Sequence, residues 1–320
     1  MDRFSLPTLR GSYATRCCGT CHNLGVPSTV EDLVRLLTLE RIDDDIFRGY
    51  TPETALQRVF GGQVLGQALM AGGLTVDPTR EVHSLHAYFL RLGDPNASIA
   101  YVVERVREGR SFSTRRVVAR QHGRPIFTMS ASFHLGEPGV DHADVMPPAP
   151  DPQTLPTIAE LVAADPAQWE LLASEWDAIE VRPILPPGMT VEELAGSDRA
   201  GAARLRVWLR AAGRLPELPL IHAAVLAYAS DMTLLGSAVV PHGIRLGDPR
   251  LFSASLDHAM WFHRPFRADE WLLHDQWSPS ASGGRGMGMG KIFDAAGNLV
   301  ASTVQEGLIR INEPEVFLLG

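Results

Sequence analysis

Two long apolar stretches, one in each half of the chain, have almost no polar face. They are FGGQVLGQALMAGGLTV at residues 60–76 and LIHAAVLAYASDMTLLGSAVV at residues 220–240. A helix that is apolar nearly all round is buried rather than amphipathic, so both stretches predict core helices. Segments rich in aromatic and β-branched residues follow them, from Val82 to Leu135 and from Phe252 to Ile311. These segments predict strands, and a long antiparallel sheet can wrap a buried helix on most sides.

The same order of elements therefore occurs twice. The helices align at VLGQA (64–68) and VLAYA (225–229), and the last strands align at GRPIFTMSASF (123–133) and GNLVASTVQEG (297–307). Self-similarity of this kind indicates an internal duplication. The expected fold class is α+β, with two similar domains that each wrap a curved antiparallel sheet around a long central helix.

Local signals divide the chain between and around these domains. Ser28 and Glu31 have capping-box spacing, which predicts that ordered structure begins at residue 28. Six prolines between Gly136 and Pro156 exclude regular structure there, and a helical pattern follows at 157–178. The expected organisation is a flexible N-terminal extension (1–27), an N-terminal domain (28–135), a Pro-rich linker with a helix (136–177), a C-terminal domain (178–312) and a tail (313–320).

Charge and hydropathy narrow the classes of partner and location. The 320 residues include 29 Lys and Arg against 37 Asp and Glu, which gives a formal net charge of -8. Nucleic-acid-binding proteins normally have a basic footprint, so we expect no nucleic-acid partner. No apolar run is expected to reach the ~20 residues that span a bilayer. The N-terminus lacks the apolar core of a secretory signal. A cytoplasmic protein without stable membrane insertion is the resulting expectation.

The cysteines do not form a convincing metal site. Cys17, Cys18 and Cys21 lie together with His22 beside them, but a structural zinc site usually takes a second ligand pair from a separate segment, and the sequence has none. A flexible extension, or a start codon placed too early, explains this segment better. No metal and no cofactor are expected.

Several catalytic motifs are absent from the sequence. It contains neither a G-x-S-x-G elbow nor HExxH. The segment GRGMGMGK (284–291) is not a phosphate-binding loop, because Arg285 and Ile292 stand where that motif needs Gly and Ser or Thr. At strand period, its four glycines share one face, which suits close approach of a helix or a ligand.

The informative chemical signal is an asymmetry between the two halves. Asp231 aligns with Met70, and Gln305 aligns with Ala131, so one half alone contains the polar pair. A carboxylate inside AVLAYASDMTLLG costs several kcal/mol unless it is hydrogen-bonded or functional. Alternatively, the helix ends at Ser230 and Asp231 caps the next turn. Both interpretations remain open from the sequence pattern.

At these residues the chain resembles the acyl-CoA thioesterase II family, whose members are two hotdog domains in tandem. The similarity covers roughly residues 33–312. It rests on the second helix and on the blocks VFGGQVLGQAL (59–69), HSLHAYFLRLGD (83–94), GRSFSTRRVVARQHGRPIFTMSASF (109–133), LDHAMWFHRPF (256–266) and VASTVQEG (300–307). The resemblance implies a catalytic trio of Asp231, Ser255 and Gln305, with Ser255 where some members have Thr. His258, Trp261, His263 and Arg264 also match the family, but we derive no chemical role for them.

The trio suits one-step hydrolysis of a thioester. Asp231 would take a proton from water, and Ser255 and Gln305 would hold that water in line. No covalent intermediate is expected, because the pattern gives Ser255 no histidine base. Backbone N–H groups near Gly61, Gly62 and Gln63 would receive the oxyanion. Candidates to bind the coenzyme A phosphates are Arg264, Arg285 and Lys291.

The expected function is hydrolysis of medium- to long-chain fatty acyl-CoA to free fatty acid and coenzyme A, a reaction of fatty acid metabolism. The alternatives are a non-catalytic acyl-CoA-binding module and an acyl-CoA hydratase or dehydratase on the same fold. Hotdog sheets often pair edge to edge, so a homodimer or homotetramer is expected.

Overall fold

The computed structural model describes residues 25–54, 56–184, 204–244, 248 and 250–311. Its first half begins with helix α1 (Val30–Leu37). The other elements of this half are β1 (Glu40–Asp43), β2 (Ile46–Gly49), central helix α2 (Gly61–Gly73), β3 (Glu81–Phe89), β4 (Ile99–Glu108), β5 (Phe112–Gln121) and β6 (Arg124–His134).

The second half repeats this order after the linker. The linker contains the short helices η1 (Pro152–Thr154), α3 (Ile158–Ala164) and α4 (Pro166–Glu175). The second half then contains β7 (Ile179–Ile184), β8 (Arg204–Ala211), central helix α6 (Pro219–Ser230), η2 (Leu234–Ala238), η3 (Val240–His242), β9 (Leu251–Ser255), β10 (Asp257–Phe262), β11 (Leu272–Ser282), β12 (Arg285–Asp294) and β13 (Leu299–Ile311).

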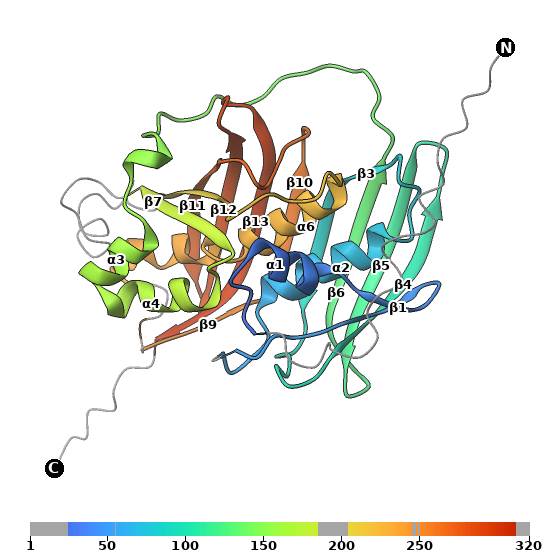
Figure 1. Ribbon diagram of the computed structural model, residues 1–320, viewed down its shortest axis with the longest axis horizontal. Coiled ribbons are helices and arrows are strands. Elements are labelled where there is room, and N and C mark those ends of the chain that lie inside the picture. The colour runs from blue at the N-terminus through green and yellow to red at the C-terminus, as the bar shows by residue number, and fades with distance from the viewer. Residues whose placement is uncertain (1–24, 55, 185–203, 245–247, 249, 312–320) are drawn as a thin grey trace.

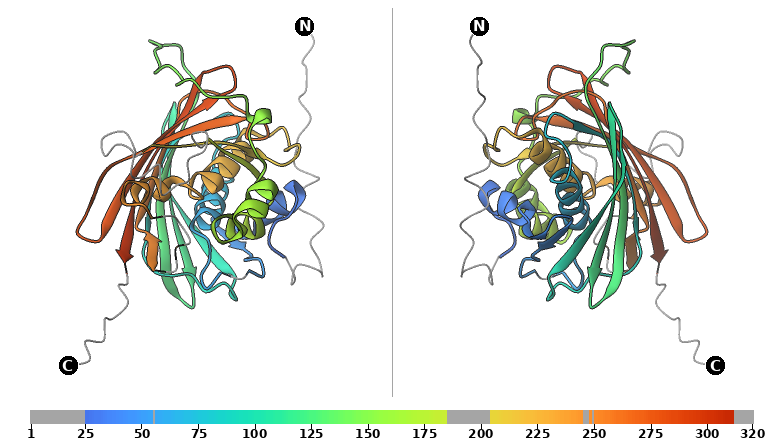
Figure 2. Two further views of the ribbon diagram at one scale, coloured as in Figure 1. Left: turned by 90° about the vertical axis from the view of Figure 1, so that its left-hand side faces the viewer. Right: turned by 90° about the vertical axis from the view of Figure 1, so that its right-hand side faces the viewer.

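All strands of the described chain belong to one antiparallel sheet. Their order is β1-β2-β4-β5-β6-β3-β10-β13-β12-β11-β8-β7, and β9 pairs with β13. This order is symmetric about the pairing of β3 with β10, where Leu85 lies opposite Met260. The sheet curves around α2 and α6, which pack against each other on its concave side (Figures 1 and 2). Two similar halves therefore share one sheet and one pair of core helices.

Burial explains why the two central helices are apolar all round. Nearly all of α2 from Gly62 to Gly72 is buried, and so is α6 from Ile221 to Ser230. The expectation that no apolar run approaches membrane-spanning length is wrong, because Pro219–His242 is 24 residues long and apolar enough to cross a bilayer. Its most apolar window is 89% buried inside the protein, as a core helix requires.

Two local predictions need correction, and four strands were not predicted. The N-cap of α1 is Thr29, whose side chain accepts a hydrogen bond from the Asp32 N–H, so the helix is capped one residue after the predicted Ser28. The helical pattern at 157–178 forms two helices rather than one, because Pro166 cannot continue a helix and instead begins α4. Strands β1, β2, β7 and β8 precede the central helices and were not predicted; β1, for example, is exposed at all four residues.

Candidate active site

Asp231 directly follows helix α6, and its carboxylate is buried. The helix ends at Ser230, where the capping alternative placed its end. The Asp231 side chain is nevertheless only 3% exposed. Its hydrogen-bond donors come from strands and from the other central helix, so it does not act as a cap of the following turn.

Ser255 and Gln305 meet this carboxylate at a single oxygen. Ser255 ends strand β9, which pairs with β13 beside Gln305. The Ser255 hydroxyl donates to Asp231 Oδ1 at 3.2 Å. Gln305 Nε2 donates to the same Oδ1 at 2.5 Å and to Ser255 Oγ at 2.8 Å. The structure thus brings together the three residues that the family resemblance implied.

The first half supplies the N-terminus of α2 to the same place. The Gly62 N–H lies in the first turn of the helix and therefore has no acceptor within it. This N–H donates a hydrogen bond to the Asp231 carboxylate. A Cβ on Gly61 would lie 2.6 Å from Asp231 Oδ2, so the close approach depends on glycine at this position. The Gln63 side chain instead donates to the Tyr50 carbonyl at 3.1 Å and therefore points toward the loop before α2.

Burial raises the pKa of Asp231 and so makes its carboxylate a better proton acceptor. Desolvation raises the pKa of the carboxyl to about 6, although hydrogen bonds from Gln305, Ser255 and the Gly62 N–H and the positive charge of Arg58 oppose the shift. A carboxylate with a pKa near 6 is ionised at neutral pH and binds a proton more readily than an exposed aspartate does.

His258 on β10 also faces Asp231, although no chemical role was predicted for it. It is fully buried, with Nδ1 3.8 Å from Asp231 Oδ1 and Nε2 2.9 Å from Ser230 Oγ. Burial lowers the pKa of this imidazole to about 3, so it is neutral at ordinary pH. The alternation of β10, in which His258 and Met260 are buried, was a signal that its side chain points inward.

Arg58, in the loop before α2, was also missed. Its guanidinium donates to the Ser253 carbonyl and lies 5.7 Å from the centre of the Phe252 ring. Both contacts are to β9, the strand that ends at Ser255. Arg58 therefore links the loop of the first half to strand β9 of the second, and its charge favours ionised Asp231.

The three cations predicted to bind phosphate are not gathered at the site. Arg264 pairs with Asp141 and donates to the Leu299 carbonyl at 2.9 Å. Lys291 pairs with Asp144 at 2.5 Å. Arg285, at the other end of β12, pairs with Glu306 at 3.0 Å. Each has a carboxylate partner, and their role toward a phosphate stays a prediction.

The glycine face of β12 receives a helix. A Cβ on Gly286 would lie 2.7 Å from Ala238 Cβ, and one on Gly288 would lie 2.6 Å from the Leu234 carbonyl oxygen. Both contacts are to η2, the turn that follows Asp231. The glycines thus allow η2 to lie directly on the sheet.

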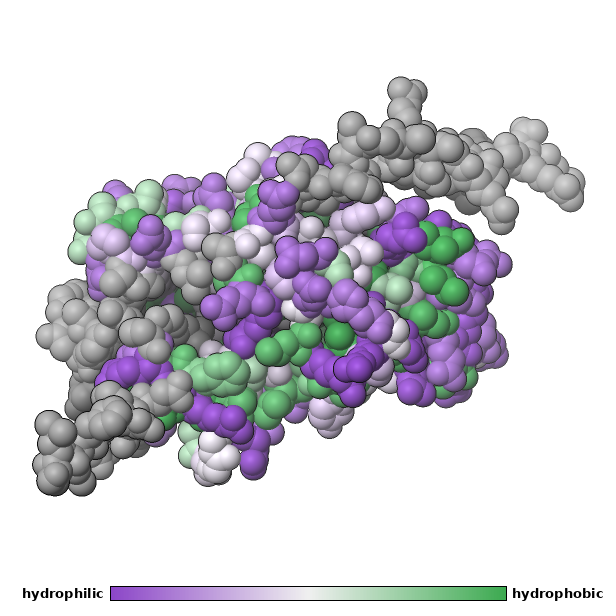
Figure 3. Space-filling model, turned by 90° about the horizontal axis from the view of Figure 1, so that it is seen from below, coloured by the Kyte–Doolittle hydropathy of each residue, from purple (hydrophilic) through white to green (hydrophobic). Residues whose placement is uncertain are grey.

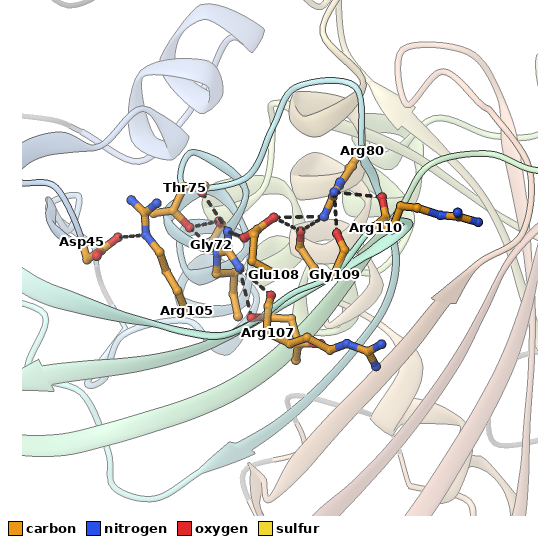
Figure 4. Close-up of polar contacts among 12 residues, drawn as sticks. Asp45, Gly72, Thr75, Arg80, Arg105, Arg107, Glu108, Gly109 and Arg110 are labelled. Atoms are coloured by element: carbon orange, nitrogen blue, oxygen red, sulfur yellow. Dashed lines mark hydrogen bonds and ion pairs between the residues drawn. The ribbon is translucent and has the colours of Figure 1, made fainter.

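The equivalent place in the first half has different chemistry. In the strand register, Gly288 lies opposite Gln305, whereas Arg115 lies opposite Ala131. The Arg115 side chain is buried and bonds Glu108 and the Thr75 carbonyl just after α2. Figure 4 shows Thr75, Glu108 and Arg80 in this network. The counterparts of Asp231 and Gln305 are thus the buried apolar residues Met70 and Ala131, and the strand beside Ala131 contains a buried, ion-paired arginine.

A cavity of about 970 Å³ opens beside the loop that leads into α2. Residues 50–54, 56 and 57 and residues 94–96 and 98 line it. Its charged lining residues are Glu53 and Asp94, which do not suit a phosphate. Within the described residues no group of three or more His, Cys, Asp or Glu side chains could hold a metal; Cys17, Cys18, Cys21 and His22 lie outside them.

Comparison with known proteins gives matches over most of the chain. A family model described as acyl-CoA thioesterase matches residues 172–308, and one described as acyl-CoA thioesterase N-terminal domain matches residues 50–134. Human acyl-coenzyme A thioesterase 8 is 40% identical over 88% of this chain and 89% of its own length.

Solved structures give the same result. The acyl-CoA thioesterase II TesB2 of Mycobacterium marinum is 44% identical, with a TM-score of 0.71 over 90% of this chain and 100% of that one. A hotdog-fold protein of unknown function from Alicyclobacillus acidocaldarius is 20% identical, with a TM-score of 0.67 over 87% of this chain and 97% of its own. The predicted fold, two tandem hotdog domains of α+β class, is confirmed.

Proposed function

Since the chain belongs to the acyl-CoA thioesterase family and is a thioester hydrolase, we propose that it converts medium- and long-chain fatty acyl-CoA to free fatty acid and coenzyme A. The observation that supports the chemistry is the buried Asp231 carboxylate, which Ser255 and Gln305 share and whose pKa burial raises to about 6. Direct hydrolysis of this kind uses no cofactor.

The proposed reaction is attack of water on the thioester carbonyl carbon. Asp231 accepts the proton of the water as its oxygen bonds to carbon, and the carbonyl oxygen becomes an oxyanion. The free N–H groups of the first turn of α2, at Gly61 and Gln63, are suited to stabilise that oxyanion. When the oxyanion collapses, the carbon–sulfur bond breaks, and the leaving thiolate takes the proton from Asp231.

Ser255 and Gln305 position the water in this scheme. Gln305 Oε1 is buried without a partner among the described groups, although Nε2 of the same amide is fully engaged. A buried acceptor of this kind suits a water molecule that needs orienting. The Ser255 hydroxyl bonds Asp231 and Gln305 rather than a histidine, which argues against Ser255 as a nucleophile.

The preference for longer acyl chains follows from the apolar interior. An acyl chain between the sheet and the central helices would gain about 0.8 kcal/mol for each buried CH₂ group. The phosphates of the coenzyme would engage Arg264, Arg285 or Lys291, which must exchange their present carboxylate partners for phosphate oxygens.

Release of free thiol from acyl-CoAs of rising chain length tests the function. Asp231→Asn is expected to lower kcat by roughly 10²–10⁴-fold, the range of a lost general base. Asp275→Asn is the matched control, because Asp275 is also buried in the second half but pairs with Arg204 and Arg206 away from the trio. Binding without thiol release would support the non-catalytic module, and conversion of a 2-enoyl-CoA to a hydroxyacyl-CoA, by addition of water across its double bond, would support the hydratase.

We also propose that the enzyme acts in the cytoplasm as a homodimer or homotetramer. Apolar residues gather among polar ones on the face in Figure 3. Tyr88 is 61% and Leu92 is 64% exposed. Exposed apolar patches often mark contacts between subunits. Light scattering measures the assembly, and a monomer at micromolar concentration would overturn it.

A further inference from the structure

His258 is the buried titratable group that contacts the site and has no part in the reaction proposed above. Its ring lies between two residues at the end of α6, with Ser230 at Nε2 and Asp231 at Nδ1. The question is which ring nitrogen has the proton, because a neutral imidazole donates from one nitrogen and accepts at the other.

The hydroxyl of Ser230 fixes the tautomer. That hydroxyl has one proton, and it lies 2.9 Å from the Ala227 carbonyl one turn back in the helix and 3.5 Å from Met260 Sδ, of which the carbonyl is the stronger acceptor. With that proton on the Ala227 carbonyl, Ser230 Oγ accepts a hydrogen bond from His258 Nε2 at 2.9 Å, and the ring is then the tautomer with its proton on Nε2. The Nδ1 atom is left with a lone pair.

That lone pair faces Asp231 without a partner. Nδ1 is buried and has no hydrogen bond among the described groups. It lies 3.8 Å from Asp231 Oδ1, too far for a hydrogen bond and with no proton on either atom while the carboxylate is ionised. Once Asp231 holds a proton, the same two atoms form a donor and an acceptor. Catalytic hydrogen bonds are often long before substrate binds and shorten afterwards.

We propose that His258 is a positioning residue whose Nδ1 accepts a hydrogen bond from Asp231 after the carboxylate has taken the proton of the attacking water. This inference rests on the proposed function, in which Asp231 is the base. The hydrogen bond between His258 and Asp231 forms only as the proton is transferred, so it stabilises the transition state more than the ground state.

The other groups around Asp231 act differently. Arg58, from the loop before α2, is the cation whose charge favours the ionised carboxylate. His274 on β11 lies near His258, but burial lowers its pKa to about 3 and it is neutral. Gln305 on β13 and the N-terminus of α2 contribute donors without charge. His258 therefore opposes Arg58 and favours the protonated acid.

The test measures kcat/KM for thiol release against pH in the intact protein. His258→Gln retains an amide that reaches Ser230 but leaves no acceptor at the Nδ1 position. Ser230→Ala keeps the ring but removes the partner of Nε2, so the proton can move to Nδ1 and bond ionised Asp231. The acid limb of the kcat/KM profile, where activity rises as Asp231 ionises, should move to lower pH by about one unit in both variants. A shift of this size corresponds to the loss of one ordinary hydrogen bond to the protonated acid. The plateau of kcat should fall about tenfold while KM stays within twofold.

His274→Gln is the matched control. His274 is equally buried, bonds Thr303 through Nε2 at 3.0 Å and has an unpartnered Nδ1. Its replacement should leave the acid limb in place even where thermal stability falls. Nitrogen-15 NMR of wild-type protein with labelled histidine reads the tautomer directly and does not depend on the folding of any variant.

The outcomes separate this inference from the proposed function. An Nε2-protonated ring in wild type together with a lowered acid limb in both variants supports the role of His258. An Nδ1-protonated ring, or variants that lose rate with an unmoved acid limb, overturns it and makes His258 purely structural. Wild type that releases no thiol, or Asp231→Asn that retains its rate, instead overturns the proposed function.

Discussion

Replacing Gly61 with alanine is expected to slow hydrolysis without weakening the fold. The new Cβ would lie 2.6 Å from Asp231 Oδ2 and 3.0 Å from Phe89 Cε1. Favourable contacts between heavy atoms begin near ~3.5 Å, so the carboxylate and the helix must separate by up to about 1 Å. That separation falls between the proposed base and the proposed oxyanion donors.

The magnitude follows from how sharply catalysis depends on position. A misplacement of about 1 Å can cost 10²-fold in rate, so kcat for thiol release should fall roughly 100-fold. Alanine is favoured over glycine in a helix by up to ~1 kcal/mol, which offsets the local crowding. Thermal unfolding should therefore show a midpoint close to that of wild type, although the activity is lost.

Gly73→Ala at the other end of α2 is the control. Its Cβ would meet Leu220 Cδ1 at 2.5 Å, but Leu220 is a flexible apolar side chain that can turn away. This variant should retain thiol release within about threefold of wild type. The reasoning is refuted if Gly61→Ala keeps the wild-type rate, or if both variants lose activity together, since the second result would indicate a general disturbance of the core.

Three further predictions concern the trio and its counterpart. Burial raises the pKa of Asp231 to about 6 in the folded protein, against 3.8 for an exposed aspartate, so ionising the carboxyl opposes folding above pH 6 and this penalty disappears below pH 4. Asp231→Asn should therefore raise the midpoint of thermal unfolding at pH 8, by an amount that shrinks to zero near pH 4. Gln305→Leu should lower kcat roughly 10²-fold, and Ser255→Ala by less, because Gln305 donates to both other members of the trio; equal losses in steady-state rates would contradict this order. Arg115→Leu should destabilise the fold by about 1 kcal/mol in urea, because the half-buried Thr75 carbonyl loses a donor while exposed Glu108 keeps Arg80, and it should keep kcat within twofold. A large loss of rate in folded protein would contradict a purely structural role for Arg115.

The core helices and the trio were predictable from the sequence for definite reasons. Helices buried on all sides must be apolar on all sides, and this pattern is visible without any partner. Asp231 and Gln305 could be recognised because the aligned residues of the first half, Met70 and Ala131, are apolar. Ser255 was identified by the family resemblance alone. The two interpretations of Asp231 were not exclusive, because the helix ends before it and the carboxylate is still buried.

What the sequence missed depends on contacts between distant segments. Arg58 reaches Ser253, and His258 reaches Ser230, and no spacing rule connects these residues. The predicted phosphate ligands Arg264 and Lys291 instead pair with Asp141 and Asp144 of the linker. The sequence shows that a residue is positively charged but not which carboxylate lies beside it in the fold. Strand β1 has no buried residue and therefore no hydrophobic alternation to detect.

The division of the site between the two halves also determines how the enzyme responds to dilution. One half provides the carboxylate and the other provides the glycines that meet it. If the halves were separate chains, the site would disappear below the dissociation constant of their pairing. Here residues 135–178 join them covalently, and a tether of this kind holds its ends at an effective concentration in the millimolar range. The proposed reaction centre thus takes its residues from a single chain, and its assembly does not depend on the protein concentration.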